Sequence, residues 1–111
     1  MNYLTATAVG HLTAAPKFFE AAGEKEAMLA FTIAVNRGED KVTYVECEMR
    51  GKNAVNVKPH LRQGKNVLAV GTPYATAYMP KEGNEPRASF KLSVYNLQLG
   101  ADAKEKGDDP V

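Results

Sequence analysis

Tryptophan is absent from this sequence, cysteine occurs once, and no long apolar run interrupts its 111 residues. The single cysteine, Cys47, can form no internal disulfide, which suits a reducing compartment. A membrane-spanning helix needs roughly 18 or more consecutive apolar residues, and no segment approaches that length. The first residues, Met1 to Thr5, also lack the basic and apolar regions of a secretory signal. We therefore expect a cytoplasmic protein without a membrane partner.

Residues that could carry out chemistry are also few. His11 and His60 are isolated, and the sequence has neither the Cys/His spacing of a metal site nor a glycine-rich phosphate loop. Cys47 alternates with polar neighbours in step with Val45 and Met49, which predicts a buried core residue rather than a nucleophile. We expect no enzyme activity, no cofactor and no metal.

Acidic residues are missing from one long stretch, although the formal net charge of the chain is only +1. Between Met49 and Lys81 there is no Asp or Glu, and this basic sector holds Arg50, Lys52, Lys58, Arg62, Lys65 and Lys81. Such a sector suits a polyanionic partner such as nucleic acid. The alternative is a lysine-rich surface that only faces water.

Most of the sequence has the period of two that is typical of half-buried strands. The length suits one domain, and the 44% of hydrophobic residues is enough for one core. Five strands are predicted, over Leu4 to Leu12, Leu29 to Val35, Tyr44 to Arg50, Asn66 to Thr76 and Ser89 to Tyr95. Gly10 and Gly71 lie inside two of them, where glycine often marks a bulge or a barrel corner.

One segment departs from this period. Ala54, Val57 and Leu61 have helical spacing, with Asn53 as the expected N-cap and Gly64 as the expected C-terminal stop. Pro59 should kink or split this helix. The resulting order β-β-β-α-β-β predicts an all-β OB-fold, a five-stranded Greek-key barrel with one short helix between its third and fourth strands.

The remaining segments are expected to be loops and a tail. The run from Pro80 to Pro86 has the composition of a mobile hairpin tip. Residues 101–111 are polar and acidic, which predicts a disordered tail after a domain of residues 1–100.

Several segments together resemble the bacterial and phage single-stranded DNA-binding (SSB) proteins. They are Val9 to Leu12, Phe31 to Arg37, Tyr44 to Lys52, Leu61 to Gly64, Val67 to Gly71 and Val94 to Leu99. The resemblance implies an OB-fold without a cofactor that binds and protects single-stranded DNA irrespective of its sequence. It also implies a nucleoid-associated homotetramer, or less commonly a dimer, that acts in replication, recombination and repair.

Aromatic residues of the SSB family stack on bases, and two of these positions fall on Tyr44 and Tyr78. Stacking grips any sequence, at about 1–3 kcal/mol per base. Tyr74 shares a side of its strand with Tyr78 by parity, and Phe18 and Tyr95 are further candidates. The alternative for each tyrosine is a half-buried strand residue with its hydroxyl in water.

Basic side chains are expected to neutralise phosphates. The candidates are Arg37, Arg50, Lys52, Arg62, Lys65, Arg87 and Lys91. Arg50 is the best of them, because it shares the outward face of its strand with Tyr44, and its guanidinium plane can also stack on a base. Lys52, Lys58 and Arg62 could instead lie on the solvent side of the helix.

Two features of the sequence predict weaker binding than is usual in the family. Glu46 and Glu48 fall by parity on the face of Tyr44 and Arg50. They either pair with Arg50 or a neighbouring lysine, or they lie off the DNA path. The family's tryptophans are also absent. We therefore expect lower affinity or a smaller footprint.

Three other functions stay open. In typical relatives an acidic tip docks replication and repair proteins, but the tail here has neither their long linker nor a terminal aromatic residue. A primosomal OB-fold dimer that binds DNA weakly and a helicase specifically is the nearest alternative. A protein-interaction or oligosaccharide-binding module is the third, because fold does not determine function.

Overall fold

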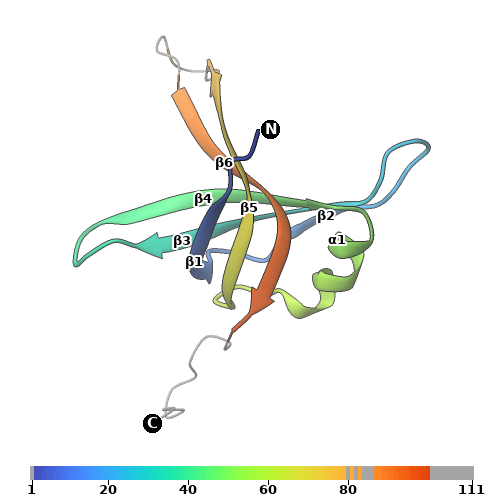
Figure 1. Cartoon of the computed structure of the whole chain (residues 1–111), viewed down its shortest axis with the longest axis horizontal. Helices are drawn as coiled ribbons and strands as arrows, with labels where there is room; N and C mark the ends of the chain where they lie inside the picture. Colours follow the sequence, from blue (N-terminus) through green and yellow to red (C-terminus); the bar gives the residue numbers. More distant parts are fainter. Residues whose placement is uncertain (1, 80, 82, 84–86, 101–111) are drawn as a thin grey trace.

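Six strands form one sheet that closes into a barrel (Figure 1). The computed structural model describes residues 2–79, 81, 83 and 87–100, without the side chains of Tyr78, Arg87 and Ala88. The strands are β1 (Ala6–Leu12), β2 (Lys17–Phe19), β3 (Met28–Asn36), β4 (Val42–Arg50), β5 (Asn66–Tyr78) and β6 (Arg87–Leu99). Their order in the sheet is β1-β5-β6-β4-β3-β2, and a further pairing of β1 with β3 closes it. β4 and β6 are parallel, and the other pairs are antiparallel.

β2 is a strand that the sequence analysis missed, but it does not change the fold. β1 pairs with β3 at His11 and Leu12, and β2 pairs with the other half of β3 from Lys17 to Phe19. The two short strands are therefore the two halves of one bent first strand. The predicted OB-fold barrel of five strands and one short helix is confirmed.

The core follows from the alternation of side chains along the strands. Val45, Cys47 and Met49 of β4 are buried as predicted, and Leu92 and Val94 of β6 complete the same side. The rest of the core consists of Leu12, Leu29, Phe31, Ile33, Ala54, Leu61, Val67 and Ala69. Because every second residue points inward, the residues between them are left on the outer face.

Gly10 and Gly71 lie where strands approach closely. A Cβ atom at Gly10 would lie 2.1 Å from the carbonyl oxygen of Ala34, and one at Gly71 would lie 2.1 Å from that of Ser93. The register between β5 and β6 also shifts between Val70 and Gly71. The predicted bulge is therefore present at Gly71, and both positions require glycine for lack of space.

The predicted helix is split, as Pro59 required, but both expected ends are wrong. Helix α1 (Gly51–Val57) is followed directly by the 3₁₀ helix η1 (Lys58–His60). α1 begins at Gly51, whose φ of 71° turns the chain out of β4 and whose N–H donates to the carbonyl oxygen of Ala27 at 2.8 Å. The N-cap is thus Arg50, without a side-chain cap, rather than Asn53.

Gly64 does not end a helix, since η1 stops at His60. Its φ is 83°, and its N–H donates to the carbonyl oxygen of Leu12 at 2.8 Å, which fastens the connection to β5 onto the barrel. The apolar side of this segment is as predicted, because Ala54 and Leu61 are buried.

Two predicted segments fall largely or wholly outside the described residues. These are the hairpin tip, where Pro80, Glu82 and residues 84–86 are not described, and the tail of residues 101–111. The domain boundary near residue 100 therefore stays a prediction. Within the described part of the chain, no helix is both long and apolar enough to cross a membrane.

Candidate nucleic-acid interface

The outward side chains of β4 and its neighbours form one surface. Tyr44, Glu46 and Arg50 are exposed and Glu48 is half-buried, as the alternation predicted. β4 lies between β3 and β6, so Glu46 faces Thr32 on one side and Lys91 on the other. Lys91 in turn lies opposite Tyr74 of β5. The sheet therefore gathers Glu46, Lys91 and Tyr74 from three strands.

A hollow of about 390 Å³ lies on this surface. Its lining residues include Lys17 and Phe19 of β2, Met28 and Thr32 of β3, Glu46 and Glu48 of β4, and Lys91 of β6. Lys17 and Phe19 are not among the predicted site residues, because β2 is too short to be predicted from the sequence. Phe19 is 51% exposed, which is enough for a base to stack on its ring.

Phe18, the neighbouring candidate, has a different role. Its side chain points to the other side of β2, where it packs against the core. The ammonium nitrogen of Lys58 lies 4.3 Å from the centre of its ring, within the range of a cation–π interaction. Stacking of Phe18 on bases stays a prediction, and its ring already contacts the core and Lys58. Because side chains alternate along β2, Phe19 rather than Phe18 lies on the outer surface.

A second hollow, of about 650 Å³, adjoins the first. Tyr44 lines it with 61% of its surface exposed, together with His11, Asn36 and Gln63. Thr13 lines both hollows, and Thr32 of the first and Ala34 of the second lie two residues apart on β3; we call the two hollows together the binding groove. The groove extends from Phe19 to Tyr44 across β3 and β4.

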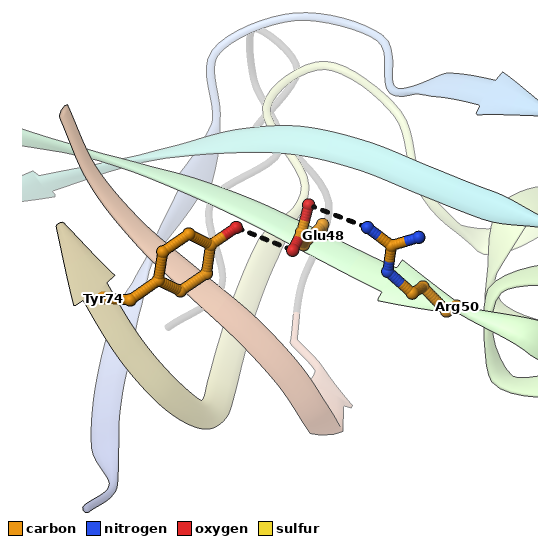
Figure 2. Close-up of polar contacts among 3 residues, drawn as sticks. All are labelled: Glu48, Arg50 and Tyr74. Atoms are coloured by element: carbon orange, nitrogen blue, oxygen red, sulfur yellow. Dashed lines mark hydrogen bonds and ion pairs between the residues drawn. The ribbon is translucent and has the colours of Figure 1, made fainter. Parts of the chain in front are cut away.

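Glu48 joins two of the predicted site residues (Figure 2). The hydroxyl of Tyr74 donates to one carboxylate oxygen of Glu48 at 2.7 Å, and Arg50 Nη2 lies 3.6 Å from the other. Of the alternatives considered for the two glutamates, pairing with Arg50 is the correct one for Glu48. The hydrogen bond to Glu48 raises the pKa of Tyr74, as do partial burial and the carboxylate charge.

Four other predicted residues are not among those that line the two hollows. Arg37 is exposed at the β3–β4 turn, and Lys52 lines a separate hollow beside Val55 of α1. Arg62 and Lys65 belong to the connection between η1 and β5. Their chain neighbours Gln63 and Gly64 line the second hollow, so a role for Arg62 and Lys65 there stays a prediction. The side chains of Tyr78 and Arg87 lie outside the described part of the structure.

Tyr95 of β6 contacts the N-terminal segment instead of the groove. Its hydroxyl lies 2.8 Å from Thr5 Oγ1 and 3.4 Å from the hydroxyl of Tyr3. The hydrogen bonds with Thr5 and Tyr3 lower the pKa of Tyr95. Although Tyr95 is exposed, it therefore lies apart from the residues that line the two hollows.

A closed barrel of this topology, with an open groove across its second and third barrel strands, defines the chain as an OB-fold protein, a class that binds oligonucleotides or oligosaccharides. The chain belongs to the single-strand binding protein family, whose model matches residues 3–99. This family is not enzymatic, in agreement with the prediction that the chain catalyses no reaction.

Two known proteins illustrate the similarity. A single-stranded DNA-binding protein of Clostridium perfringens is 29% identical over 77 residues, which are 68% of this chain and 51% of that protein. The match thus spans about half the length of that relative. The crystal structure of a small single-stranded DNA-binding protein from Streptomyces coelicolor has a TM-score of 0.77 at 19% identity, and the match covers 90% of this chain and 96% of that one. This structural similarity supports the fold.

Proposed function

We propose that this chain binds single-stranded DNA without sequence preference, by stacking bases on aromatic side chains and neutralising phosphates. The observation that carries the proposal is the binding groove, which has the exposed rings of Phe19 and Tyr44 at its ends. Lys17 and Lys91 line the groove between them. Membership of the single-strand binding protein family and the names of the two similar proteins support the same function.

The charges on the groove indicate how much of the affinity should come from phosphate contacts and how much from stacking. Lys17 and Lys91 line the groove together with Glu46 and Glu48, and Arg50 adds a third positive charge beside Glu48 on the outward face of β4. For single strands the slope of log K against log salt is about −0.7 per neutralised phosphate. We therefore expect a shallow slope, with stacking rather than charge supplying most of the affinity.

Titration with oligo-dT at two salt concentrations tests the proposal. We expect binding at low salt that weakens as salt rises. Absence of binding at low salt, or binding with no salt dependence, would refute a phosphate-backbone ligand.

Two substitutions test the stacking surface. Phe19→Ala and Tyr44→Ala should each weaken binding, because a stacked base contributes about 1–3 kcal/mol, or roughly 5- to 150-fold in Kd. The matched control is Tyr95→Ala, which removes an exposed ring that lines neither hollow and should leave the Kd unchanged. Equal effects of all three substitutions would contradict the assignment. Tyr78 remains a further stacking candidate.

The proposal extends to a homo-oligomer, a tetramer or else a dimer, that protects DNA in replication, recombination and repair. An apolar strip supports self-association, since half-exposed Val9 of β1 lies beside Leu68 in register and close to Val70 of β5. Light scattering with and without oligo-dT measures the assembly. A tetramer would argue against the alternative of a dimeric primosomal accessory protein, whereas a dimer that binds a helicase more tightly than DNA would favour that alternative.

A further inference from the structure

The two contacts of Glu48 differ in strength. The Tyr74 hydroxyl donates at 2.7 Å, an ordinary distance for a hydrogen bond between two oxygens. The Arg50 pair, at 3.6 Å, is longer than a hydrogen bond, and the side chains of Arg50 and Glu48 are 52% and 22% exposed. Water and salt screen such an ion pair, so it can be exchanged for another anion more easily than the hydrogen bond can be broken.

We propose that Glu48 is a positioning residue that holds the Tyr74 ring on the binding face and keeps Arg50 neutralised until a DNA phosphate replaces the carboxylate. This inference rests on the proposed function, because it assigns Glu48 a role in binding a single strand. One carboxylate oxygen of Glu48 accepts the hydrogen bond from Tyr74, and the other pairs with Arg50 (Figure 2). The hydrogen bond holds the Tyr74 ring where a base can stack on it. The ion pair means that a phosphate must compete with Glu48 for Arg50.

Glu48→Gln separates the two parts, because the amide keeps an oxygen acceptor for Tyr74 but loses the charge that pairs with Arg50. Affinity for oligo-dT should rise roughly two- to fivefold at fixed salt, the range expected for releasing an exposed ion pair. The salt slope should steepen by about 0.7, the value for one phosphate, because the displaced Glu48 carboxylate of the wild-type protein takes up a cation that offsets the one the phosphate releases. A change in slope reports charge at the interface and would not result from a purely structural role for Glu48.

Arg50→Gln tests whether the gain passes through Arg50. In the wild-type background this substitution should weaken binding, but by less than in the Glu48→Gln background, because a phosphate must first displace the Glu48 carboxylate from the guanidinium. In the Glu48→Gln background it should abolish the whole gain, so the double-mutant cycle should be strongly non-additive. Additive effects of the two substitutions would overturn the competition between Glu48 and phosphate.

The matched control is Glu46→Gln. It removes the same charge from the same face of β4, but no hydrogen bond or ion pair joins Glu46 to Tyr74 or Arg50 in the described part of the chain, and its charge reaches Tyr74 only through space. An equal gain in affinity and slope for both variants would show a general electrostatic effect and overturn the inference. Failure of the wild-type protein to bind oligo-dT would instead overturn the proposed function.

A second measurement needs no DNA. NMR titration of Tyr74 should show its pKa falling towards the ordinary value in Glu48→Gln, because the charged acceptor that stabilises the protonated hydroxyl is lost. Tyr74→Phe should then weaken oligo-dT binding without altering the salt slope, since the ring remains but is no longer held. An unchanged Tyr74 pKa, or unchanged affinity of Tyr74→Phe, would contradict the positioning role.

Discussion

Gly71→Ala should destabilise the barrel through a clash between two strand backbones. The added Cβ would lie 2.1 Å from the carbonyl oxygen of Ser93 and 2.8 Å from the Cα of Val94, against 3.4–4 Å for ordinary contact. Both neighbours are backbone atoms of β6 in register with β5, so they cannot move without breaking the pairing. The φ of Gly71 is not in the left-handed region, so the effect comes from lack of space alone.

The loss of stability caused by Gly71→Ala is the difference between a steric cost in the folded protein and an entropic gain from the unfolded chain. Overpacking costs about 1–3 kcal/mol or more, and the depth of this contact favours the upper part of that range. Replacing glycine by alanine offsets about 0.4–1 kcal/mol by restricting the unfolded chain. A net loss of about 2 kcal/mol remains, and at roughly 4–8 °C per kcal/mol the Tm should fall by about 8–16 °C.

Thermal unfolding followed by circular dichroism measures this fall in Tm. All variants should be compared at one protein concentration, because self-association would raise the apparent stability. The control is Gly23→Asn in the turn between β2 and β3. A Cβ there meets nothing within 4 Å, and asparagine tolerates the φ of 58°. Its Tm should change by less than about 3 °C, as for an ordinary surface substitution. A Gly71→Ala protein as stable as the control would refute the steric account.

Three further predictions concern the core. Leu29→Ala should cost about 2–5 kcal/mol in urea unfolding, because Leu29 is fully buried and its loss leaves a cavity. Phe18→Ala should cost about 2 kcal/mol and Phe19→Ala under about 1 kcal/mol, because Phe18 packs on the core whereas Phe19 is exposed; equal losses would contradict their orientations. Burial raises the pKa of Cys47 to about 12 from 9.0, so the unfolded chain loses the thiol proton first and stability should fall as pH rises from 9 to 12. The Cys47→Ala variant should not show this part of the pH dependence of stability. In the native protein the thiol should react slowly with an aromatic disulfide reagent at pH 8.

The sequence predicts the barrel well because local alternation determines which residues are buried. Val45, Cys47 and Met49 lie inside and Tyr44, Glu46 and Arg50 outside, as the period of two requires. Pro59 likewise predicts the break between α1 and η1. β2 was missed because three residues are too few to show a period, and its two adjacent phenylalanines conceal which of them points outward.

The candidate site is less predictable because it depends on pairings between distant strands. The contact between Tyr74 and Glu48 joins residues 26 positions apart, through the parallel pairing of β4 with β6 and the antiparallel pairing of β6 with β5. Neither the register nor the bulge at Gly71 can be read from alternation, which gives a residue's face but not its neighbour across the sheet. The sequence therefore predicted that Glu48 faces outward without predicting Tyr74 as its partner.

The absence of tryptophan and the presence of Glu46 and Glu48 have a common consequence for binding. With Glu46 and Glu48 offsetting the charges of Lys17 and Lys91 along the groove, we expect weaker electrostatic attraction to the DNA backbone and an affinity that depends more on stacking. The proposed stacking surfaces are rings smaller than tryptophan, Phe19 at one end of the groove and Tyr44 at the other. Such an interface should lose affinity mainly when a ring is removed and only moderately when salt is raised. An SSB protein that relies on many lysine–phosphate contacts should show the opposite balance.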